Sequence, residues 1–77
     1  MNRLTLFKRV CMALWGPQYR SEGARQLDIS LRTMMRYDAG ESPVPEEIMD
    51  KLTSILERRT REINELTDRM EREMRVG

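Results

Sequence analysis

The stretch that most constrains the fold is residues 19–37, where two short helical segments are joined by a tight turn. Asp28 lies at the turn, and aspartate is one of the few side chains that tolerate left-handed backbone. Ser30 follows where a hydroxyl can cap the next helix. Ala24 is small where the two helices must approach each other. The pattern predicts two helices held at a fixed angle, which is the spacing of a helix-turn-helix.

Apolar periodicity, caps and breakers predict four helices in an all-α chain, over residues 3–15, 18–27, 30–38 and 45 to about 74. Gly16 and Pro17 end the first helix, and Gly40 is placed to end the third. Pro45 suits the start of the fourth. A chain of 77 residues forms at most one domain. Because so small a core is marginal alone, we expect self-association.

Composition excludes several classes of function. The chain has no histidine and a single cysteine, Cys11, so it lacks a disulfide within one chain and a histidine-based catalytic triad. We therefore expect no enzyme, no metal site and no cofactor. The apolar segments are too short to span a bilayer, and residues 1–15 contain Lys8 and Arg9 and no small-residue cleavage site. The expected location is the cytoplasm.

Charge is distributed unevenly along the chain. Residues 1–37 carry seven basic and two acidic side chains, a net charge of +5. Residues 38–77 carry seven basic and eleven acidic side chains, a net charge of −4. A basic face for nucleic acid beside a separate oligomerisation helix would produce this asymmetry.

The second helix of the pair presents a distinctive outer face. Leu31, Arg32, Met35 and Arg36 lie on the side turned away from the first helix. In a helix-turn-helix this helix enters the major groove, where two arginines four residues apart suit guanine edges or phosphates. The alternative is an ordinary solvated helix face.

The last predicted helix is too long for its own domain. An unbroken helix of roughly 30 residues is ~45 Å long. A dense apolar block is expected to dock on the first three helices, and comprises Ile48, Leu52, Ile55 and Leu56. Beyond it a thinner stripe predicts a short, imperfect coiled coil. The expected dimerisation residues are Leu56, Ile63, Leu66 and Met70. We divide the chain into a DNA-binding domain, 1–56, and a distal dimerisation segment, 57–77. Alternatively, the distal helix is solvated and frays.

The stretch ALWGPQYRSEGARQLDISLRTMMRYDAGESPVPEEIMDKLTSIL, residues 13–56, resembles the small helix-turn-helix transcriptional regulators of bacteriophages and mobile elements. These share the broad lambda-repressor-like fold. The segment ISLRTMMRYDAGESPVP carries most of the likeness, since it joins a recognition helix to a glycine and a proline-rich entry to another helix. The chain also resembles anti-CRISPR-associated repressors, which are short dimeric repressors of their own operons.

The resemblance implies roles for individual positions. Core positions would be Leu27, Ile29, Met34 and Tyr37. Base-contacting positions would be Ser30, Arg32, Thr33, Met35 and Arg36. Phosphate contacts would come from Gln18, Tyr19 and Arg20, and Arg25 is added for its charge. Two positions depart from the family pattern, because Gly23 replaces a larger apolar residue and Asp28 replaces glycine.

Together these features predict a homodimer that binds a palindromic operator on double-stranded DNA. The expected function is sequence-specific repression of a phage or mobile-element operon, including the protein's own. Two alternatives remain. The chain could be a helical protein-interaction module, such as an inhibitor of a host protein machine. It could also be an RNA-binding regulator that uses the same arginines.

Overall fold

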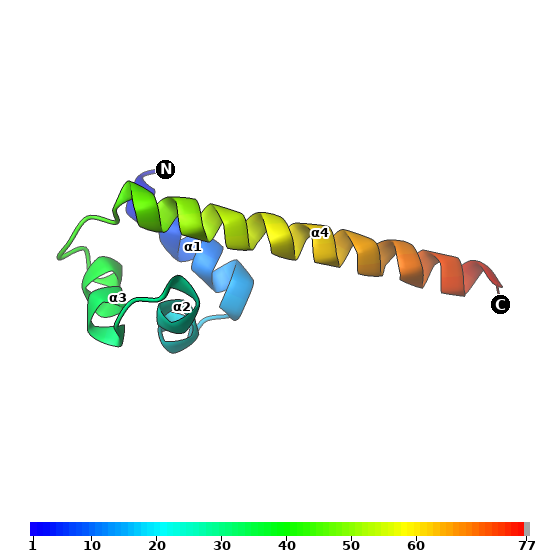
Figure 1. Cartoon of the computed structure of the whole chain (residues 1–77), viewed down its shortest axis with the longest axis horizontal. Helices are drawn as coiled ribbons and strands as arrows, with labels where there is room; N and C mark the ends of the chain where they lie inside the picture. Colours follow the sequence, from blue (N-terminus) through cyan, green and yellow to red (C-terminus); the bar gives the residue numbers. More distant parts are fainter. Residues whose placement is uncertain (77) are drawn as a thin grey trace.

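In a computed structural model that describes residues 1–76, the chain forms four helices. They are α1 (Arg3–Trp15), α2 (Arg20–Leu27), α3 (Leu31–Asp38) and α4 (Glu46–Val76). Helices α1, α2 and α3 cluster against one side of the first half of α4, and the rest of α4 projects away from them (Figure 1). The molecule is accordingly elongated, with extents of 53 × 21 × 21 Å. The predicted all-α fold with a long C-terminal helix is confirmed.

The helix ends follow from local chemistry. Gly16 and Gly40 both adopt positive φ, at 86° and 76°, as the helix-ending glycines were expected to do. Asp28 takes the left-handed conformation with φ 58° and ψ 47°. The Ser30 hydroxyl oxygen accepts a hydrogen bond from the backbone N–H of Thr33, at 3.0 Å, and thus caps α3. Helix α2 begins at Arg20, two residues later than predicted, because Tyr19 is its N-cap residue.

The core is formed between α1, α2, α3 and the first half of α4. Its fully buried side chains include Phe7, Cys11, Leu27, Met34 and Leu52. The ring of Phe7 meets that of Tyr37 edge-on, with the ring centroids 6.3 Å apart. Edge-to-face packing is a favourable arrangement for two aromatic rings. The core predictions for Leu27, Met34 and Tyr37 are therefore confirmed, and Ile29 packs against the core while only partly buried.

The linker between α3 and α4 is anchored to α1. Val44, which lies between two prolines, is only 3 % exposed. The linker therefore contributes a side chain to the core. Arg3 donates from Nη1 to the carbonyl oxygen of Val44, at 3.1 Å, and from Nη2 to the Glu46 carboxylate, at 2.9 Å. Arg3 thus joins the first residue of α1 to the first residue of α4.

The distal part of α4 has no packing partner within the described chain. Every side chain from Glu57 to Arg75 is exposed. Gly77, the last residue of the predicted dimerisation segment, lies outside the described residues. Within residues 1–76, none of the helices combines the length and apolar character that crossing a membrane would require.

Candidate nucleic-acid interface

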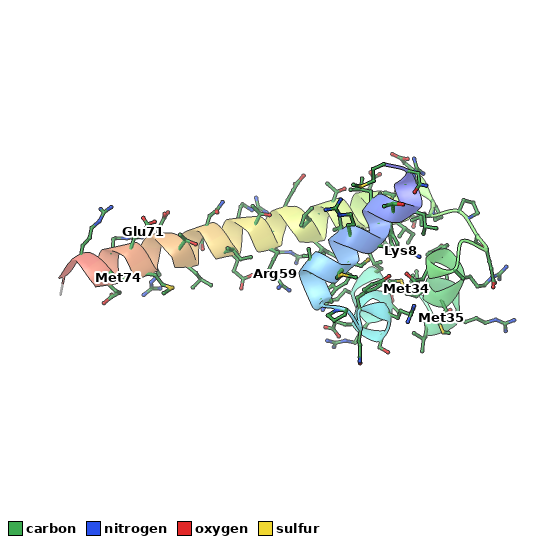
Figure 2. The ribbon with its side chains drawn as sticks, turned by 180° about the vertical axis from the view of Figure 1, so that it is seen from behind. Lys8, Met34, Met35, Arg59, Glu71 and Met74 are labelled. Atoms are coloured by element: carbon green, nitrogen blue, oxygen red, sulfur yellow. The ribbon has the colours of Figure 1, made fainter. Side chains whose placement is uncertain are left out.

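The outer face of α3 carries two arginines and two exposed apolar side chains. Leu31 and Met35 are 46 % and 52 % exposed, and Arg32 and Arg36 are also exposed. In Figure 2, Met34 lies between α3 and the neighbouring helices, where it is fully buried, whereas Met35 lies on a different side of α3 and is exposed. A shallow groove on this face is lined by Leu31, Arg32, Met35, Arg36, Ala39 and Glu41. Neither arginine forms an ion pair within the described residues.

A second groove extends this face toward the start of α2. It is lined by Gln18, Arg20, Ser21, Leu31 and Met35. Because both grooves include Leu31 and Met35, they form one continuous surface across α3 and the first turn of α2. The structure therefore brings two predicted phosphate-contacting residues, Gln18 and Arg20, beside the predicted base-contacting face.

Other predicted contacts are arranged differently. The Ser30 hydroxyl donates to the hydroxyl oxygen of Thr33, at 2.9 Å, while it also caps α3. The hydroxyls of both residues are therefore engaged with each other at the start of the helix. Arg25 lines neither groove, and its guanidinium makes a forked pair with the Glu22 carboxylate one turn earlier in α2, at 2.7 and 3.1 Å.

Tyr19 lies in the core, which corrects the expectation that its side chain contacts phosphate. It is only 5 % exposed, and its hydroxyl donates to Oδ1 of Asp38. Oδ2 of the same carboxylate accepts from Nε of Arg20, at 2.7 Å. Asp38 therefore ties the last residue of α3 to the first residues of α2. We call these three residues the Asp38 clamp.

The clamp holds a buried negative charge. Burial alone would raise the pKa of Asp38, but the hydrogen bonds from Tyr19 and Arg20 outweigh it, and the pKa is lowered. Burial and the bond to this carboxylate raise the pKa of Tyr19 to about 12. Lys8 on α1 adds a smaller attraction. At neutral pH the clamp is thus an ionised carboxylate that receives two donors and fixes the angle between α2 and α3.

The clamp also orients Arg20 within the second groove. Only Nε is engaged by Asp38, and the side chain is 56 % exposed. A guanidinium has five N–H donors in a rigid plane, so the two terminal nitrogens are held in position for a further acceptor. Nothing in the sequence pointed to Asp38, because its two partners lie 18 and 19 residues earlier in the chain.

Packing explains why glycine, and not a larger apolar residue, occupies position 23. A Cβ at this position would lie 2.8 Å from the Met34 methyl group and 3.2 Å from the Trp15 ring. These two side chains occupy the volume that a larger residue in α2 would need. Gly23 therefore permits the close approach of α2 to α1 and α3, and Trp15 packs against the core as a partly buried residue.

The single cysteine, Cys11, is buried. Burial raises the pKa of the Cys11 thiol to about 12, so the sulfur stays protonated within the core. In the described part of the chain, no three cysteine or carboxylate side chains are placed to hold a metal ion. Comparison with protein-family models, curated proteins and solved structures finds no match to this chain.

Proposed function

We propose that this protein is a sequence-specific DNA-binding regulator that acts as a dimer and represses transcription. The observation that carries the proposal is the continuous surface formed by α3 and the first turn of α2. It places Arg32, Arg36 and Met35 on an exposed helix, with Arg20 oriented beside them by Asp38. Arginine pairs well with guanine edges, and a methionine side chain offers apolar contact to a thymine methyl group.

The rigidity of the α2–α3 unit supports the same proposal. A recognition helix discriminates between bases only when its side chains are held in a fixed register on the duplex. Ser30 fixes the start of α3, Asp38 fixes its end, and Met34 anchors its inner face. Repression requires only that the bound protein obstruct the polymerase.

The first experiment is selection of bound fragments from random duplex DNA. We expect an enriched inverted repeat, and failure to enrich any sequence would refute sequence-specific binding. On the selected site, Arg36→Ala should cost ~1–3 kcal/mol and relax preference at one position. Arg20→Ala should weaken all duplexes similarly, because phosphate contacts carry no sequence information. Retention of full specific affinity by Arg32→Ala and Arg36→Ala would show that the interface lies elsewhere.

A second candidate function is that of a protein-interaction module, which is favoured by the long exposed face of distal α4. Salt dependence separates the two candidates. Binding that neutralises several phosphates should weaken by orders of magnitude between low and moderate salt. Weak, salt-insensitive association with DNA would favour the interaction module. Competition between duplex DNA and RNA of the same sequence would identify an RNA-binding regulator.

A further inference from the structure

Helix α4 carries two rows of residues with seven-residue spacing. The first row is apolar throughout and consists of Met49, Leu56, Ile63 and Met70. The second row alternates leucine with charge and consists of Leu52, Arg59, Leu66 and Glu73. Rows of this spacing form the seam of a coiled coil. The seam therefore extends through the exposed half of the helix, with a basic residue near one end and an acidic residue near the other.

This seam continues the face that α4 uses in its own core. At about 100° per residue, Leu52, Ile63 and Met70 point within about 20° of one another. Leu52 is 2 % exposed, whereas Ile63 and Met70 are 53 % and 65 % exposed. In Figure 2, Arg59 and Met74 project from the edge of α4 that faces the side of α1–α3, and Glu71 projects from the other edge. Helices α1–α3 cover this face of α4 in the first half of the helix, and the same face is uncovered in the distal half.

One flank of the seam is uncharged. It carries Thr53, Thr60 and Thr67, again seven residues apart. Each threonine hydroxyl donates to the carbonyl oxygen four residues earlier in α4, at 2.8 to 2.9 Å. Because these donors are already satisfied within the helix, this flank can be covered by an apolar or threonine surface without leaving a hydroxyl unpaired.

The other flank carries charges of both signs. Glu62 and Arg69 lie seven residues apart beside Ile63 and Met70. Both side chains are exposed, and neither forms an ion pair within the described residues. The two flanks therefore differ in character, and this difference determines how a second helix fits.

A parallel pairing of two copies makes poor use of these charges. In a parallel dimer each row faces the same row of the partner, so Arg59 would oppose the partner's Arg59, and Glu73 would oppose the partner's Glu73. The charged flank would meet the threonine flank, so Glu62 would gain no cationic partner. Two like-charge contacts in the seam would oppose association.

We propose that a second copy of this chain pairs antiparallel with the distal half of α4, placing Ile63 against the partner's Leu66 and Glu62 against the partner's Arg69. Antiparallel helices bring like flanks together, so the threonine flank meets its own counterpart. The two-fold axis repeats the ion pair between Glu62 and Arg69. Arg59 comes within about one helical turn of the partner's Glu73. The two like-charge contacts of the parallel dimer are thus replaced by two contacts between opposite charges.

The charges also select the register. Sliding one helix by seven residues in one direction places Glu62 against the partner's Glu62. Sliding it in the other direction places Arg69 against the partner's Arg69. Only the intermediate register pairs opposite charges, and it is also the register that joins Ile63 to the partner's Leu66 at the centre of the dimer.

This inference rests on the proposed function only in taking the protein to be a DNA-binding dimer, and it specifies how the two units are arranged. The overlap of the helices covers residues 56–73. At 1.5 Å per residue, the starts of the two α4 helices would lie ~55 Å apart. The α1–α3 units would occupy opposite ends of the dimer, so the half-sites of the operator should be separated by more than one DNA turn, which is about 34 Å.

Charge reversal tests the ion pairs. Glu62→Arg should lower the association constant of the full-length protein at least about tenfold, because it creates two repulsive contacts in the proposed register. Adding Arg69→Glu to the same chain should restore association by reversing both charges. Glu65→Arg is the matched control, since it makes the same charge change on the outer surface and should alter association less than about threefold. Failure of the second change to rescue the first would overturn the register.

Spin labels test the orientation directly. Arg75→Cys, labelled in a Cys11→Ala background, places one label near the end of each α4. The antiparallel register puts these positions ~32 Å apart along the helix axis, whereas a parallel pair would place them within about 20 Å. A short distance, or no dipolar coupling because the protein is monomeric, would overturn this proposal. Either result leaves DNA binding to be decided separately, by the selection experiment on the unmodified protein.

Discussion

Removing the carboxylate of Asp38 should destabilise the protein through its tyrosine partner more than through its arginine partner. Asp38→Ala leaves the Tyr19 hydroxyl without an acceptor at a position that is 5 % exposed. An unsatisfied buried donor costs ~1–3 kcal/mol. The Arg20 side chain is 56 % exposed and returns to water, which limits the loss of that ion pair to below about 1 kcal/mol. The expected total is about 1–4 kcal/mol.

A double-mutant cycle isolates the hydrogen bond. Urea unfolding followed by circular dichroism, at one fixed protein concentration, gives the free energy of unfolding for each variant. Tyr19→Phe added to Asp38→Ala should recover part of the loss, because the orphaned hydroxyl is removed with its oxygen. The coupling between the two sites should reach about 1 kcal/mol or more. Asp50→Ala is the control, since it removes an exposed carboxylate and should change stability by less than about 0.5 kcal/mol. Strictly additive losses would refute the clamp as an energetic unit.

Three further predictions concern pH, the turn and the dimer. The lowered pKa of Asp38 means that its contribution is present above the ordinary carboxyl range and is lost as pH falls through the folded-state value. The stability difference between the native protein and Asp38→Ala should therefore narrow below about pH 4, and a constant difference in acid unfolding would contradict this. Asp28→Gly should raise the free energy of unfolding by about 0.5–1 kcal/mol, because φ is 58° at this position. Asp28→Asn, which keeps a side chain at this position, should not give the full gain in stability; equal stability gains would exclude the backbone explanation. Ile63→Asp combined with Leu66→Asp should produce a monomer in sedimentation and reduce operator affinity while α1–α3 stay folded. A dimer that persists with full affinity would place the interface on α1 or at Trp15.

Helix positions could be predicted because their signals are local. A glycine after a helix, an aspartate in a tight turn and a serine before a helix each act within a few residues of their own backbone. Gly16, Ser30 and Gly40 adopt conformations that their residue types favour, and Asp28 adopts one that aspartate tolerates. The apolar rows of α4 are likewise visible in the sequence, because a helix converts regular spacing into a single face.

The candidate interface was predictable only in part. Arg32, Met35 and Arg36 lie on the exposed face of α3 as their spacing requires. Their role on DNA stays a prediction. Arg25 pairs instead with Glu22 on its own helix, and the three-residue spacing of the two side chains already permits this contact.

The sequence by itself determined where the helices begin and end, apart from the start of α2, and also which faces are apolar and how charge divides between the halves of the chain. Tertiary structure decided which polar groups meet. Tyr19 could not be placed in the core from its neighbours, since burial of its hydroxyl depends on a carboxylate 19 residues away. Gly23 could not be justified before Met34 and Trp15 were seen to fill the adjoining volume. Backbone conformation follows from interactions within a few residues, whereas packing and buried hydrogen bonds require atoms that only the folded chain brings within contact distance.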